Sequence, residues 1–181
     1  MTTSRRNVLL AMTAGLLQTA CRTLPWQAPR DDRHVLIVSV SEQKMVLFED
    51  GKELASYPIS TAKNGIGDAP DSYMTPGGRM EIAEKFGSAE VPGTVFKDRA
   101  PTGEVVAVDA PGRDPVVTRI LWLRGLEPQN QNAYRRFIYI HGTPQENLLG
   151  SPVSFGCIRM RSSDIVSLYE RVGVGAQVLV R

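Results

Sequence analysis

Two side chains that could perform covalent catalysis lie close together in the sequence, His141 and Cys157. A thiol attacks a carbonyl when a base takes its proton and when hydrogen-bond donors stabilise the oxyanion that forms. His141 can be that base and Cys157 the nucleophile. Gly156 permits a tight turn, so the backbone amides of Gly156 and Cys157 could point at a substrate carbonyl. A cysteine that serves only as a small buried hydrophobic residue is the alternative that residue types leave open.

The segments around this pair have the composition needed to position it. An apolar run at 137–140 predicts a strand that delivers His141. A loop rich in Gly and Pro follows and leads to Ser154-Phe155-Gly156-Cys157-Ile158-Arg159. Tyr139 alternates with two isoleucines along the predicted strand, so we expect it on the opposite face, as a cleft residue or as a core aromatic.

The complete pattern, His-Gly, an interval and Ser-x-Gly-Cys-Ile-Arg, resembles the signature of the YkuD-type L,D-transpeptidases. These are peptidoglycan enzymes with a Cys nucleophile and a His base. The resemblance covers about residues 35–180 at the level of the fold, and Thr75-Pro76-Gly77-Gly78 resembles an upstream Thr-Pro-x-Gly element of the family. This chain departs from the commonest form of the signature at Phe155, where a second His usually precedes the Gly-Cys pair.

The resemblance implies a role for each residue of the pattern. His141 would take the thiol proton and later protonate the leaving amine, with its ring oriented by the backbone carbonyl of Gly142. The implied substrate is a peptidoglycan stem tetrapeptide, cleaved before its terminal D-Ala, and the acyl group would pass to an amine. Arg159 could hold a substrate carboxylate bidentately, although a surface salt bridge is an equal alternative without the motif. No metal or organic cofactor is required. The remaining candidate substrate contacts are Ser154, Phe155 and Tyr139.

Other functions remain as alternatives. A sortase also has His, Cys and Arg on a β-barrel, but its His lies much further upstream than the sixteen positions that separate His141 from Cys157. Papain-like and NlpC-type peptidases usually have Cys before His. Within the same fold, the chain could be an L,D-carboxypeptidase that releases D-Ala by hydrolysis, or a non-catalytic cell-wall-binding lipoprotein. The acceptor amine is left open, between another stem peptide, a lipoprotein lysine and water.

The first 21 residues have the composition of a bacterial export signal. Arg5 and Arg6 precede an apolar run that is too short to span a bilayer, and small residues then precede Cys21. The Arg pair resembles a twin-arginine signal, and residues 17–21 resemble a lipoprotein cleavage box. We therefore expect a protein of the periplasm or cell envelope that is anchored to the membrane by a lipid on Cys21, with residues 22–33 as a tether.

Composition and charge exclude several classes of protein. With 181 residues, 42% hydrophobic and 22% charged, the chain can form one globular domain after its leader. The formal net charge is +2, and Arg5 and Arg6 supply both units. The near-neutral remainder argues against nucleic-acid binding. The two Cys and two His residues lack zinc-ligand spacing, so we predict neither a metal site nor a disulfide between Cys21 and Cys157. The oligomeric state is left open.

Short strands separated by turn signals predict a mainly β domain over residues 34–181, as two packed sheets or an open β-barrel. The resemblance implies the same architecture, that of the L,D-transpeptidase catalytic domain. Residues 62–78 and 87–103 are expected to form loops. One helix is predicted near 163–172, because apolar residues recur there at helical spacing after a Ser-Ser-Asp cap. The predicted strands are 34–40, 44–48, 53–60, 105–108, 119–123, 137–140 and 176–180.

Overall fold

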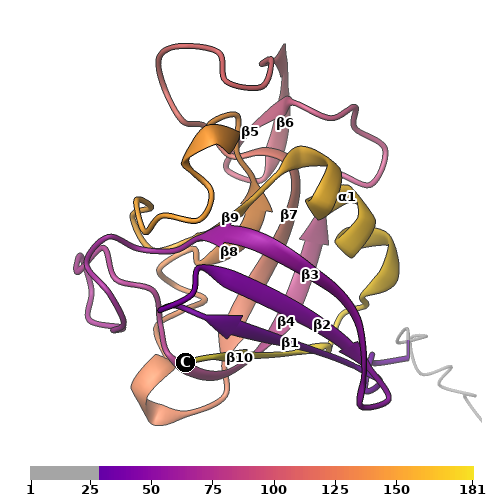
Figure 1. Ribbon diagram of the computed structural model, residues 1–181, viewed down its shortest axis with the longest axis vertical. Helices are drawn as coiled ribbons and strands as arrows, with labels where there is room; N and C mark the ends of the chain where they lie inside the picture. Colours follow the sequence, from indigo (N-terminus) through magenta and orange to yellow (C-terminus); the bar gives the residue numbers. More distant parts are fainter. Residues whose placement is uncertain (1–28) are drawn as a thin grey trace, which may run out of the picture.

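In the part of the chain that the structure describes, alternating apolar residues form ten β-strands, which the computed structural model shows together with one α-helix, α1 (Figure 1). The mainly β fold class predicted from the sequence is therefore confirmed. The structure describes residues 29–181, so the predicted export signal, Cys21 and most of the predicted tether lie outside the described residues. The first five strands are β1 (His34–Ser39), β2 (Lys44–Glu49), β3 (Lys52–Ser60), β4 (Gly78–Phe86) and β5 (Thr94–Lys97).

The remaining elements complete the sheet and connect it to the helix. Two short 3-10 helices, η1 (Pro128–Asn130) and η2 (Glu146–Leu148), lie in the loops on either side of β8. No helix within residues 29–181 combines the length and the apolar character needed to cross a membrane. The later strands and the helix are β6 (Ala100–Val105), β7 (Val117–Gly125), β8 (Tyr139–Gly142), β9 (Ile158–Met160), α1 (Ser162–Arg171) and β10 (Gln177–Val180).

The sheet closes on itself. Its strand order is β4-β10-β1-β2-β3-β9-β8-β7-β5-β6, and β4 also pairs with β7. If the terminal β5–β6 hairpin is set aside, eight of the ten strands therefore form a ring. Such closure leaves the eight strands without unpaired edges. Of the two architectures that the sequence left open, the structure shows a barrel, and the barrel is closed rather than open.

One apolar core fills the barrel. Inward-facing residues from all eight strands of the ring contribute to it, and α1 adds Ile165, Leu168 and the adjacent Val172. Each fully buried Leu or Ile side chain contributes about 1.5–3 kcal/mol to folding. The core residues of the three strands that carry the candidate site are Leu121, Leu123, Ile140, Ile158 and Met160, and Ile138 joins them from just before β8.

The predicted helix is present, but its cap differs. Arg161 is the N-cap and its side chain forms no capping hydrogen bond, whereas the sequence had suggested Ser162 to Asp164. The first-turn amide of Ser162 instead donates to the carboxylate of Glu146, at 2.8 Å. A carboxylate from a distant loop thus satisfies a free N–H at the start of the helix, where a negative charge is favourable.

The largest departure from the sequence prediction is the β5–β6 hairpin, which lies within the expected loop 87–103 and extends to Val105. Asp98 and Arg99 form its turn with φ angles of 50° and 67°. Both values lie in the left-handed region, where Asn and Gly are the usual residues, so the sequence carried no turn signal. The predicted strand 105–108 was wrong beyond Val105, where β6 ends.

The candidate site lies on the outer face of β7, β8 and β9. Because side chains alternate along a strand, Ile140 and Ile158 point into the barrel while His141 and Arg159 point outward. A second apolar cluster on this outer face contains Ile120, Trp122 and Tyr139, with Phe96 from β5 packed over them. The β5–β6 hairpin thus covers part of the face that carries the site.

Candidate active site

Cys157 lies at the end of a turn that leads into β9. Gly156 has a φ angle of 128°, and a Cβ at this position would come within 3.3 Å of the Met74 carbonyl oxygen. Both constraints favour glycine. The Gly156 carbonyl accepts a hydrogen bond from Thr75 Oγ1 at 3.0 Å, and Thr75 Oγ1 accepts one from the Ala62 amide at 3.0 Å. The upstream Thr-Pro element and the cysteine turn are therefore joined directly.

Ser154 supports the same turn from within. Its hydroxyl donates to the carbonyl oxygen of Cys157 at 2.6 Å and accepts from the Gly156 amide at 3.2 Å. The residue is buried. Ser154 was expected to be a substrate contact, but its hydroxyl is enclosed by the turn and has both hydrogen bonds there. The placement makes it a structural support for the turn that carries Cys157.

The sulfur of Cys157 lies against the backbone of β8. The Tyr139 amide donates to Sγ at 3.4 Å, and Sγ donates to the Phe137 carbonyl at 3.4 Å. Burial raises the pKa of the Cys157 thiol to about 11, more than offsetting the Tyr139 amide and the Arg136 charge, which both lower it. The group is therefore a protonated thiol at neutral pH, which agrees with its donation to a carbonyl.

The ring of His141 is held in one tautomer. Its Nδ1 lies 2.8 Å from the Gly142 carbonyl oxygen, which is the contact that the family resemblance implied. Because a carbonyl only accepts, Nδ1 carries the proton and Nε2 is the basic nitrogen. Burial lowers the pKa of His141, so the ring is neutral at pH 7. Within residues 29–181, Nε2 has no hydrogen bond.

Pairing between β8 and β9 brings the predicted nucleophile and base to one face. The parallel register sets His141 opposite Arg159, and two residues earlier on each strand Cys157 meets Tyr139. The two catalytic candidates are thus separated by a step of two residues, about 7 Å along the strands. Among the described residues, Sγ forms no hydrogen bond to the His141 ring. Catalytic hydrogen bonds often tighten only when substrate binds.

Arg159 is buried and paired within the chain. Its guanidinium forms an ion pair with the Asp114 carboxylate, and it also donates to Ser60 Oγ at 3.1 Å and Gln145 Oε1 at 3.2 Å. Only 3% of the residue is exposed. We had expected Arg159 to hold a substrate carboxylate, but here the carboxylate that it holds belongs to Asp114. Asp114 was not anticipated, because no spacing in the sequence relates it to β9.

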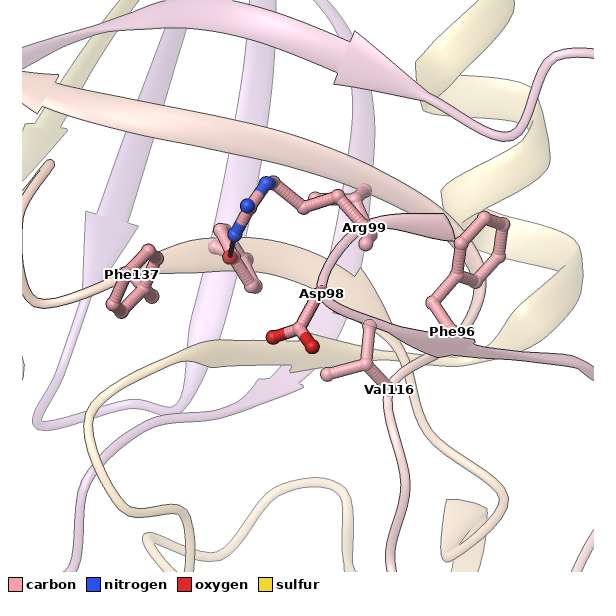
Figure 2. A pocket seen from close by; sticks show the side chains of 7 residues that line it. Phe96, Asp98, Arg99, Val116 and Phe137 are labelled. Carbon is pink, nitrogen blue, oxygen red and sulfur yellow. Dashed lines mark hydrogen bonds between the residues drawn. The ribbon is translucent and has the colours of Figure 1, made fainter. Parts of the chain in front are cut away.

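A cavity of about 260 Å³ lies over the outer face of β7 and β8 (Figure 2). Figure 2 shows the Arg99 guanidinium reaching across this space and the Asp98 carboxylate pointing into it. Arg99 donates to the Tyr139 hydroxyl at 3.2 Å, and its guanidinium lies 4.6 Å from the Trp122 ring centre. Tyr139 is therefore both a core aromatic and a wall of this cavity. The lining residues are Phe96, Asp98, Arg99, Val116, Ile120, Phe137 and Tyr139.

A second cavity, of about 480 Å³, shares Phe137 with the first. The Phe137 carbonyl accepts a hydrogen bond from Sγ, so the sulfur contacts the backbone of the residue that lines both cavities. Phe155 lines the second cavity and is 67% exposed, with its ring edge-to-face against Tyr73 at 5.8 Å. Phe155 thus lines this cavity from the protein surface. The lining residues are Pro70, Asp71, Tyr73, Asn132, Arg135, Arg136, Phe137 and Phe155.

The family described as YkuD, the L,D-transpeptidase catalytic domain, matches residues 33–180. The chain belongs to this family. Within residues 29–181 no group of three or more His, Cys, Asp or Glu side chains is arranged to hold a metal ion.

Relatives and solved structures agree with this family. The probable L,D-transpeptidase YcfS of Escherichia coli (strain K12) is 27% identical over 86% of this chain and 47% of its own length. The probable L,D-transpeptidase ErfK/SrfK of the same strain is 28% identical over 87% of this chain and 48% of its own length. L,D-transpeptidase 3 from Mycobacterium tuberculosis, with a faropenem-derived adduct, matches the fold with a TM-score of 0.54 and 22% identity, over 82% of this chain and 60% of that chain. The chain spans about half the length of these two curated relatives.

The join between Thr75 and the cysteine turn predicts a loss of stability on substitution. Thr75→Val keeps the shape of the side chain but leaves the Ala62 amide and the Gly156 carbonyl without their buried partner. We expect the free energy of unfolding to fall by about 1–3 kcal/mol, measured by urea denaturation. Ser56→Val, at an exposed position of β3, is the control and should change stability by less than about 0.5 kcal/mol. Equal urea midpoints for the two variants would contradict this account of the turn.

Proposed function

We propose that this chain is a peptidoglycan L,D-transpeptidase with Cys157 as its nucleophile. The observation that carries the proposal is the juxtaposition on one outer sheet face of a thiol and a neutral imidazole, beside two cavities. Membership of the YkuD family supports the choice of reaction and of substrate, a stem peptide. The bond attacked is the one before the terminal D-Ala.

The proposed reaction has two steps, acylation of Cys157 and transfer of the acyl group, and His141 is the proton acceptor in both. As Sγ attacks the carbonyl, Nε2 of His141 takes the thiol proton, and the resulting imidazolium protonates the leaving amine of D-Ala. An acceptor amine then attacks the thioester, His141 takes a proton from that amine, and the proton returns to the departing sulfur. The ring can act in both directions because the Gly142 carbonyl holds its Nδ1–H.

The resting pair is neutral, so activation must accompany substrate binding. Burial raises the pKa of Cys157 to about 11 and lowers the pKa of His141, which disfavours a preformed thiolate–imidazolium pair. Attack requires Sγ to exchange its hydrogen bond to the Phe137 carbonyl for one to Nε2. The amides of Gly156 and Cys157 are the proposed oxyanion donors. Because the Gly156 amide already donates to Ser154, the Cys157 amide has the larger share of that role.

The cellular setting is part of the same proposal. Stem peptides lie outside the cytoplasmic membrane, so the enzyme would be exported to the periplasm or cell envelope. Residues 1–21 would direct export and Cys21 would bear a lipid anchor, with stem peptides as the partners. Mass spectrometry of the mature protein extracted from membranes tests the anchor, because an unmodified Cys21 would exclude it.

One experiment separates the proposed activity from its alternatives. The full chain is incubated with a stem tetrapeptide, with and without an excess of a second stem peptide as amine acceptor, and the products are weighed by mass spectrometry. A transpeptidase gives a cross-linked dimer that has lost one D-Ala. Mostly tripeptide, even with abundant acceptor, identifies an L,D-carboxypeptidase. No product and no carbapenem adduct on Cys157 identifies a non-catalytic wall-binding protein.

A further inference from the structure

A loop distant in sequence brings one acidic side chain against the strands of the site. Asp114 follows the β5–β6 hairpin, and its carboxylate accepts a hydrogen bond from Thr143 Oγ1 at 2.5 Å while its other oxygen pairs with Arg159. The side chain of Asp114 is 25% exposed and that of Arg159 only 4%. In the described part of the chain, Asp114 is the one acidic side chain that pairs with Arg159.

Both partners of Asp114 lead back to His141. Arg159 is the direct neighbour of His141 across the β8–β9 ladder, on the same outer face. Thr143 lies two residues after His141, and its amide donates to the Met160 carbonyl at 3.0 Å. Between them lies Gly142, whose carbonyl holds the ring. Asp114 therefore fixes both the cation beside the ring and the backbone that orients it.

The two charges act on the ring in opposite directions. Asp114 favours the protonated imidazolium and Arg159 opposes it, and within residues 29–181 these are the two charged groups that act on the pKa of His141. Without Asp114, Arg159 would be a buried cation with no counter-charge beside a residue that must become positive during the reaction. Without Arg159, the negative charge of Asp114 would act on the ring with no positive charge to oppose it.

We propose that Asp114 is a positioning residue, and that Asp114 and Arg159 form an internal charge pair that orients His141 and balances the charge developing on its ring. The inference rests on the proposed function, because it takes His141 as the base. It replaces the substrate-clamp role that the sequence suggested for Arg159. A clamp predicts a higher KM when Arg159 is changed, whereas a positioning pair predicts a lower kcat with little change in KM.

The test is a pH titration of the His141 ring by NMR in the full chain. The chain has two histidines, so His34→Gln assigns the signals. Asp114→Asn keeps the oxygen that accepts from Thr143 but removes the charge, and the ring should titrate at lower pH than in the wild type. Arg159→Gln should move the titration to higher pH. In each variant the acid limb of kcat/KM should move in the same direction as the titration of the ring. In Asp114→Asn, kcat should also fall by up to about 100-fold.

Two further variants make the result decisive. Arg113 precedes Asp114 in the same loop and forms an exposed ion pair with Glu104 of β6. Arg113→Gln breaks this pair and should leave the titration of His141 unchanged. The double variant with Asp114→Asn and Arg159→Gln removes both charges, and its ring should titrate between the two single variants. A merely structural role would loosen the site, expose the ring and move both single variants to higher pH, which would overturn the inference. If the His141 titration shifts in opposite directions in the two single variants but the chain makes no transpeptidation product, the proposed function is rejected and this inference is retained.

Discussion

Cys157→Ala is expected to abolish turnover and covalent labelling while the fold remains intact. The side chain is small and partly buried, and its sulfur contacts the backbone of Phe137 and Tyr139 through two long hydrogen bonds of 3.4 Å. Alanine occupies the same space without a nucleophile, so no thioester can form. The rate should fall by about 10⁶-fold, or below detection, in the stem-peptide assay analysed by mass spectrometry.

The second cysteine of the chain supplies the matched control. Cys21 lies in the predicted leader, outside the proposed chemistry, so Cys21→Ala should retain the full rate in a detergent-solubilised assay. The urea midpoint of Cys157→Ala should stay close to that of the wild type, which separates loss of chemistry from loss of folding. Product formation by Cys157→Ala, or a carbapenem adduct that maps to Cys21, would end the proposal.

Local sequence signals predicted the elements whose residues carry their own pattern. The strands β1 and β2 and the helix α1 have apolar residues at the period of the element, so their positions were predicted within about two residues. β9 has three residues and was not predicted as a strand, because it exists through pairing with β3 and β8. The β5–β6 hairpin was missed because its turn is formed by Asp98 and Arg99 and not by the usual turn residues. Closure of the barrel was not predicted either, because it depends on pairing between β4 and β7, which are distant in sequence.

The residues of the candidate site also divide into those that the sequence indicated and those that only the structure shows. Cys157, His141 and Gly142 belong to one short stretch with a recognisable motif, and the structure brings them to one face. Ser154 has the residue type of a substrate contact, but its hydroxyl is enclosed within the turn, which only three-dimensional geometry shows. Asp114 had no signal at all, since it reaches the site through a loop and pairs with a residue 45 positions away.

His141→Ala is expected to lose about 10²- to 10⁴-fold in kcat/KM, the usual contribution of a positioned general base. The pH profile then shows which group titrates. Burial lowers the pKa of His141, so the wild-type ring stays deprotonated, and the enzyme active, to a pH below its ordinary value. Without the ring, the rate should follow the thiolate fraction of Cys157, whose pKa is about 11, so about one percent is available at pH 9.

The residual activity of His141→Ala should therefore rise about tenfold per pH unit up to the pKa of Cys157. It should not show the acid limb of the wild type, which levels off above the pKa of His141. Rescue at high pH stays partial, because no imidazolium remains to protonate the leaving amine of D-Ala. His34→Gln is the matched control, since His34 lies at the start of β1 and its ring contacts Asp31, so its profile should match the wild type. An acid limb that persists in His141→Ala would show that another group is the base. The two neutral partners, Cys157 and His141, would then have to be assigned different roles.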